Sequence, residues 1–153
     1  MGNNWKEVLA KSFEDNQILV SSIRETREKF DHFCEFIAEP GFEQLKEELD
    51  SYKVGAKIQR IKGYSISFQT NFMKSSISQF QYVVYLPKNS IQLELKSRVG
   101  GRKTKKGIVE LNECLFMEEA APSTVMDISQ EDFIHEVIRY YRNFLFISSV
   151  SAE

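Results

Sequence analysis

The chain has 153 residues, of which 42% are hydrophobic and 27% are charged, and its formal net charge is −2. This length fits one domain with one core, and the composition excludes a disordered or fibrous chain. Cys34 and Cys114 form no Cys-x-x-Cys pair, which argues against a zinc site or a redox dithiol, and both are expected to be buried thiols. No apolar run approaches the roughly 20 residues of a membrane-spanning helix. We expect a cytoplasmic chain without a membrane span.

The first predicted element is a long helix. Residues 3–39 contain neither Pro nor Gly, and apolar residues recur there at three- and four-residue steps. An unbroken helix of this length would extend roughly 55 Å, which exceeds the diameter of a domain of this size. We therefore expect a break at residues 14–17, where Asp15 and Asn16 can cap a new helix. In the alternative, part of the helix projects and packs on a second copy. An extended coiled coil is disfavoured by polar residues on the apolar stripe, namely Ser12, Asn16 and Thr26.

Pro40 and Gly41 are expected to end this helix, because proline disfavours helical backbone in the residue before it. A shorter helix should follow over residues 42–52. The hydrophobic period then changes from about 3.6 to two, for example in residues 64–72, which is typical of half-buried strands. The predicted strands span residues 53–61, 64–72, 80–86, 91–95 and 108–117.

The last predicted element is a closing helix, for which Ser129 is placed as the N-cap with Asp132 three residues later. Because the strands are consecutive and joined by short links, we predict an antiparallel sheet of about five strands with the helices on one face. The expected fold class is α+β. The expected organisation is a single domain of residues 1–153, with N-terminal helices over 3–52, strands over 53–117 and the closing helix over 129–147.

Charge is distributed very unevenly along the chain. Residues 1–50 contain 6 basic residues (Lys or Arg) and 12 acidic ones (Asp or Glu). Residues 51–109 contain 12 basic residues and 1 acidic residue, and residues 110–153 contain 2 basic and 9 acidic residues. This pattern predicts a basic sheet between acidic helices, and an electropositive surface of this kind suits an acidic protein, a nucleic acid or an anionic membrane surface. In the competing interpretation, the strand charges block the sheet edges and complement the acidic helices of the same molecule.

The basic residues are densest at the end of this segment. Residues 100–107 are predicted to form a hairpin loop. It differs from a phosphate-binding P-loop because Ile108 and Val109 follow Gly107, where that motif has Lys and then Ser or Thr. A mobile, solvated hairpin tip is the alternative. The residues predicted to contact a partner are Lys96, Arg98, Arg102, Lys103, Lys105 and Lys106.

The sequence contains no complete catalytic or metal-binding pattern. No serine lies in a Gly-x-Ser-x-Gly motif, and His32 points away from Cys34 because the two are only two residues apart on a helix. Three carboxylates, those of Glu113, Glu118 and Glu119, lack the ligand spacing of a calcium loop. We therefore expect no cofactor and no metal site, and nothing in the sequence favours an enzyme.

Together these features predict a non-enzymatic interaction module that binds an acidic or anionic macromolecule through a basic sheet and hairpin. One alternative is a nucleic-acid-binding protein. Another is a small-ligand carrier or enzyme with a site between sheet and helices, lined by Phe68, Tyr82 and Tyr141. We expect a homodimer, formed through the N-terminal helix or a sheet edge.

Overall fold

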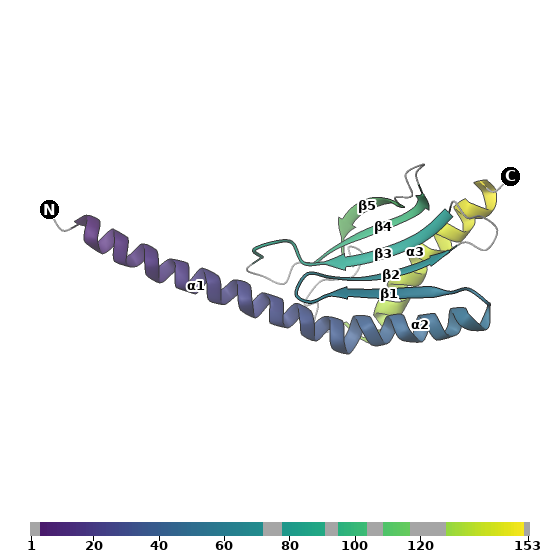
Figure 1. Ribbon diagram of the computed structural model, residues 1–153, viewed down its shortest axis with the longest axis horizontal. Coiled ribbons are helices and arrows are strands. Elements are labelled where there is room, and N and C mark those ends of the chain that lie inside the picture. The colour runs from purple at the N-terminus through teal and green to yellow at the C-terminus, as the bar shows by residue number, and fades with distance from the viewer. Residues whose placement is uncertain (1–3, 72–77, 91–94, 104–108, 117–127, 152–153) are drawn as a thin grey trace.

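The structure is a computed structural model of the chain, and it describes residues 4–71, 78–90, 95–103, 109–116 and 128–151. A long helix, α1 (Asn4–Phe33), continues through a π-helical turn (Cys34–Ala38) into α2 (Glu39–Ser51). Five strands follow, and α3 (Gln130–Ser151) closes the chain (Figure 1). The predicted α+β class, with N-terminal helices, an antiparallel sheet and a closing helix, is confirmed.

The strands form one sheet in which each pairs antiparallel with the next, in the order β1-β2-β3-β4-β5. The register places apolar residues of neighbouring strands opposite one another. Ile58 of β1 lies opposite Phe68 of β2, and Phe68 lies opposite Tyr82 of β3. The strands are β1 (Ala56–Ile61), β2 (Ser65–Asn71), β3 (Ser78–Tyr85), β4 (Lys96–Lys103) and β5 (Val109–Leu115).

The hydrophobic core lies between one face of the sheet and the helices α2 and α3. Aromatic rings fill it: Phe42 of α2 stacks on Phe68 at a centroid distance of 5.1 Å, and Phe133 of α3 meets Phe42 at 5.0 Å. Tyr141 of α3 contacts Phe80 edge to face at 5.2 Å. The side chain of Ser129 caps α3 by accepting a hydrogen bond from the Asp132 N–H at 3.0 Å, as predicted.

The expected break at residues 14–17 is wrong, because α1 is continuous across them. Residues 4–20 are all exposed to solvent. The side chains of Asp15 and Asn16 are therefore hydrated while their backbone stays helical, so these polar residues do not require the helix to break there. Figure 1 shows the consequence: the first half of α1 extends past the end of the sheet, with no other described element beside it.

The expected end of the helix at Pro40 and Gly41 is also wrong. In the π-helical turn the Glu39 N–H donates to the Cys34 carbonyl, five residues back, and this wider turn leaves room for the proline ring in the first turn of α2. Gly41 serves close packing instead. A Cβ atom added there would lie 3.0 Å from Cδ2 of Phe133 and 3.5 Å from Cγ1 of Ile134, so glycine lets α2 approach α3.

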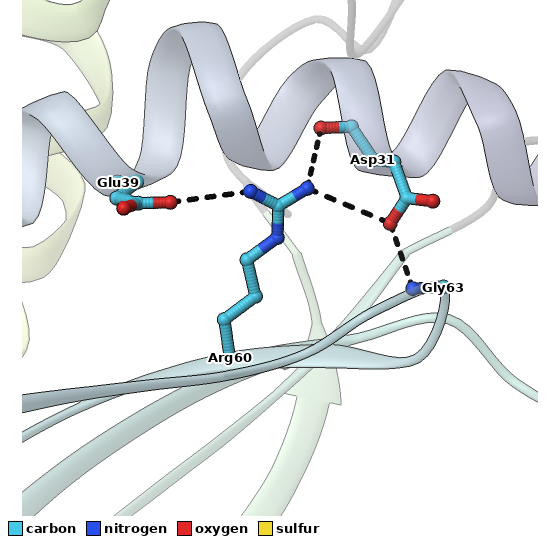
Figure 2. A network of polar contacts seen from close by, with 4 residues as sticks. All are labelled: Asp31, Glu39, Arg60 and Gly63. Atoms are coloured by element: carbon cyan, nitrogen blue, oxygen red, sulfur yellow. Dashed lines mark hydrogen bonds and ion pairs between the residues drawn. The ribbon is translucent and has the colours of Figure 1, made fainter.

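A polar network joins this long helix to the β1–β2 turn (Figure 2). The Asp31 carboxylate accepts a 2.7 Å hydrogen bond from the Gly63 N–H. Arg60 of β1 donates to the Asp31 carbonyl at 3.2 Å and pairs with Glu39 at 3.2 Å. Gly63 has a φ of 76°, which favours glycine, and Arg27 lies over the Tyr64 ring at 5.2 Å. These contacts fix the direction in which α1 leaves the body.

Cys34 lies at the start of the π-helical turn and is completely buried, as predicted; the side chain of Cys114 lies outside the described part of the structure. Burial raises the pKa of the Cys34 thiol from its ordinary value of 9.0 to about 12, although the Arg60 charge acts in the opposite direction. The native thiol is therefore protonated and unreactive at neutral pH.

The packing at Gly41 leads to a first prediction. Gly41→Val should lower the free energy of unfolding by about 1–3 kcal/mol, because the added carbons overpack the contact with Phe133. Urea denaturation measures this. Gly55→Val is the matched control, since a Cβ at Gly55 meets nothing within 4 Å. Equal effects at the two glycines would contradict the packing role.

The network at Asp31 leads to a second prediction. Asp31→Ala removes the acceptor of the Gly63 N–H and the anion beside Arg60, so the free energy of unfolding should fall by about 1–3 kcal/mol. Glu35→Ala, an exposed acid on the adjacent turn, is the control and should change stability by less than about 0.5 kcal/mol. A similar small loss at Asp31 would show that the network does not hold the helix.

The buried thiol leads to a third prediction, on pH dependence. Between pH 9 and about 12 the unfolded chain releases the Cys34 proton and the folded chain retains it, so the native state loses stability as pH rises through this window. Urea unfolding of the wild type and of Cys34→Ala should therefore give different pH slopes, with the wild type falling more steeply above pH 9. Parallel curves would mean that the thiol titrates normally.

Candidate functional site on the open face of the sheet

The sheet has one covered face and one open face. Ile58, Phe68 and Tyr82 occupy opposed positions on the covered face, where they meet the helices. Their neighbours along each strand point to the other side, because side chains alternate. The helices α2 and α3 both pack on the covered side, so the open face is free of them.

Strand register arranges the open face in rows that cross the sheet. One row contains Gln59, Ser67, Val83, Arg98 and Glu113, each opposite the next. A neighbouring row contains Ile61, Ser65, Tyr85 and Lys96, and a third contains Lys57, Gln69 and Gln81. The open face therefore consists largely of hydroxyl, amide and basic side chains.

Arg98 contacts both an aromatic ring and an acidic side chain on this face. Its guanidinium lies over the Tyr85 ring, 4.2 Å from the centroid, and its Nε is 3.8 Å from a Glu113 carboxylate oxygen. The side chains of Arg98 and Glu113 are 49% and 51% exposed, so water screens this ion pair and weakens it. The arginine is held in place by a ring and by a weak partner that an incoming anion can replace.

Other basic groups of the central segment differ in their surroundings. Lys57 and the turn residue Lys62 are exposed, and Lys96 is partly exposed. Arg60 lies on the covered side, opposite Ile66, and pairs with the acidic residues Asp31 and Glu39 of the helices. At Arg60 the basic strand complements the acidic helices of its own molecule.

The structure places two of the six predicted contact residues on the open face, Lys96 and Arg98. Arg102 and Lys103 belong to β4, but their side chains lie outside the described part of the structure, as do Lys105 and Lys106 entirely. The prediction of a loop from Gly100 is wrong for its first half, since β4 continues to Lys103. The pairing registers shift between Gly100 and Arg102, so the glycine pair accommodates a β-bulge and not a turn.

Sequence reasoning missed the rows across the open face. Alternation within one strand shows which of its residues share a face of the sheet. The row from Gln59 to Glu113, however, exists only because four strand pairings have a particular register. Tyr85 stands beside Lys96 and Arg98 for the same reason. The sequence signal that indicated an open polar face was the alternation of Ser65 and Ser67 with apolar residues in β2.

A site between sheet and helices has little room where the structure describes it. Phe68 and Tyr82 are fully buried, Tyr141 is nearly so, and all three contact aromatic rings of other elements. An open hollow of about 330 Å³ lies instead on the surface at β1 and β2, lined by Gln59, Arg60, Ile61, Ser65 and Ser67. Its lining offers hydrogen-bonding groups and one arginine but no acid–base pair.

The described residues contain no group of three or more His, Cys, Asp or Glu placed to hold a metal ion. Within the same ranges, none of the helices combines the length and apolar character that crossing a membrane requires.

Comparison of the chain with protein-family models, with curated proteins and with solved structures found no match in any of the three. The function must therefore be inferred from the geometry of the molecule itself.

Proposed function

We propose that this chain is a non-enzymatic interaction module that binds an acidic or anionic macromolecule across the open face of its sheet. The observation that carries this proposal is the combination of Lys57, Lys96 and Arg98 on a face with one described acid, Glu113, and no covering helix. Basic groups on a shared face attract an acidic partner and orient it.

The uncharged side chains of the face support the same interpretation. Ser65, Ser67 and Gln69 on β2 and Gln81 on β3 are partly exposed and can donate hydrogen bonds to carboxylate oxygens. Arg98 adds two parallel donors in a geometry that matches a carboxylate, and its stacking on Tyr85 limits the conformational entropy that binding removes. We favour an acidic protein segment as the partner.

A nucleic acid is the second candidate, and one observation favours it. Tyr85 and Arg98 form a stacked pair on an open antiparallel face, and single-stranded nucleic acids stack their bases on such side chains. The negative net charge of the whole chain weakens long-range attraction to a polyanion. The predicted hairpin residues, Arg102, Lys103, Lys105 and Lys106, would extend the surface for either partner.

We also propose that the module self-associates through the projecting part of α1. This surface is preferred to the β1 edge of the sheet, because it exposes several large apolar side chains whereas the described residues of β1 expose one, Ile61. A cytoplasmic location remains a prediction from the sequence.

The surface assignment gives a fourth prediction. The triple variant Lys57→Glu, Lys96→Glu, Arg98→Glu should weaken binding of a fluorescent polyglutamate peptide by about tenfold, because three exposed charge contacts are worth about 0.5 kcal/mol each. Fluorescence anisotropy at low ionic strength measures this. A single-stranded oligonucleotide serves as the second probe, and preferential binding to it would favour the second candidate.

The matched control changes the net charge equally at exposed bases elsewhere, with Lys29→Glu, Lys46→Glu and Arg142→Glu. It should retain most of the affinity. A further variant reverses Arg102, Lys103, Lys105 and Lys106 and tests the hairpin separately. If the wild type binds neither probe, or if the control loses as much affinity as the face variant, the open face is not the binding surface.

A further inference from the structure

The projecting part of α1 exposes large apolar side chains along one side. Trp5 is 62% exposed and Phe13 is 66% exposed, values that are unusual for aromatic residues of a folded chain. We call this surface the free stripe. Its members are Trp5, Val8, Leu9, Phe13, Leu19, Val20 and the partly exposed Ile23.

The free stripe is the start of a seam that the molecule itself covers further along. Beginning at Trp5, alternating steps of four and three residues reach Leu9, Ser12, Asn16, Leu19 and Ile23. The same steps then reach Thr26, Phe30 and Phe33, which are buried against the body. Such a seven-residue repeat is typical of a helix that packs lengthwise on another helix.

We propose that a second copy of this chain covers the free stripe, with the two α1 helices antiparallel and a two-fold axis near Glu14. This inference deepens the self-association included in the proposed function. Under this symmetry Trp5 meets the partner's Ile23 and Leu9 meets the partner's Leu19, while Val8 and Val20 flank these layers on opposite sides of the seam. Each pair of positions is symmetric about residue 14, so the free stripe is complementary to itself.

The polar interruptions of the stripe fit the same symmetry. Ser12 and Asn16 are also equidistant from Glu14, so each Asn16 lies opposite the partner's Ser12. The Ser12 hydroxyl already donates a hydrogen bond to the Val8 carbonyl of its own helix at 2.8 Å. Its oxygen can still accept a hydrogen bond from the side-chain amide of the partner's Asn16. Polar groups thus meet polar groups in two equivalent layers, which also specifies the register.

The body of the molecule excludes the parallel arrangement. From Thr26 to Phe33 the side of α1 that carries the seam is occupied by the chain's own core. If a partner helix ran parallel and in register, its residues 26–33 and the body attached to them would have to occupy the same space as this core. In the antiparallel arrangement each helix covers only residues 5–23 of the other, and this is the part of α1 that the chain's own body leaves uncovered.

The area of the stripe is sufficient for a specific dimer. Its exposed side chains present apolar surface on the order of 500 Å² per copy, from typical areas of aromatic and aliphatic side chains. Two copies with their flanking polar side chains reach the roughly 1,000 Å² that a specific interface requires. The 12 residues from Glu14 to Thr26 span about 18 Å, so the two bodies begin about 36 Å apart and present two open faces.

The fifth prediction concerns sedimentation of the full chain. The wild type should sediment as a dimer that dissociates on dilution, and emission of Trp5, the single tryptophan, should shift to longer wavelength as it becomes exposed. Leu9→Asp should be monomeric at the same concentrations, because it places two charges in the apolar interface. Ile18→Asp should remain dimeric. Ile18 is 61% exposed but lies on the opposite side of α1, which makes it the matched control.

Disulfide trapping tests the orientation. Oxidation of the double variant Leu9→Cys, Leu19→Cys should give a dimer linking position 9 to position 19, identified by mass spectrometry. Leu9→Cys alone should not cross-link, because the two copies of residue 9 lie about 15 Å apart in the antiparallel dimer, beyond the reach of a disulfide. Oxidised wild type controls for the native cysteines.

Any of the following results would overturn this inference: a wild type that is monomeric at all concentrations, an Ile18→Asp variant that dissociates like Leu9→Asp, or efficient cross-linking by Leu9→Cys alone. A Trp5 emission shift seen only with anionic phospholipid vesicles, in a monomeric chain, would assign the stripe to a membrane surface and also overturn it. Leu9→Asp should retain the affinity of each open face for the polyglutamate peptide. Loss of dimerisation and loss of peptide binding are therefore separately observable.

Discussion

The hydrogen bond between the Asp31 carboxylate and the Gly63 N–H, with Arg60 beside it, is the contact on which the shape of this molecule depends. It joins the middle of a continuous helical rod to the turn between β1 and β2. Because the rod is fixed there and again through the packing of α2 on α3, the preceding part of α1 cannot fold back on the sheet. The protein therefore has a compact body and a helical extension whose direction is set by named contacts.

The body has a second asymmetry, which lies across the sheet. All large aromatic rings of α2 and α3 in the described core meet one face, and the other face carries serine, glutamine, lysine and arginine side chains. The charge segregation along the sequence thus has two structural outcomes. Arg60 neutralises acidic residues of the helices, whereas Lys57, Lys96 and Arg98 remain on the open face. A surface of this kind suits recognition of an extended acidic segment, and a dimer would present it twice.

Local sequence signals predicted the elements well wherever local and tertiary preferences agree. The alternation of Ile66 and Phe68 with serines and the cap at Ser129 are both present in the structure. Pro40 and Gly41 misled because a π-helical turn and the close approach of Phe133 outweigh the usual preference of these residues to end helices. The rows of the open face need the register of all strand pairs. No pattern within a single strand contains that information.

The expected break in α1 was argued from size, since a helix of this length exceeds the body. The structure resolves this conflict by letting the helix project, which leaves an apolar stripe in water. Small-angle X-ray scattering of the full chain tests the resulting account most directly. A dimer of two bodies at opposite ends of paired α1 helices predicts a pair-distance distribution with two separate maxima. A single maximum from one compact particle, or a mass equal to one chain at every concentration, would contradict it.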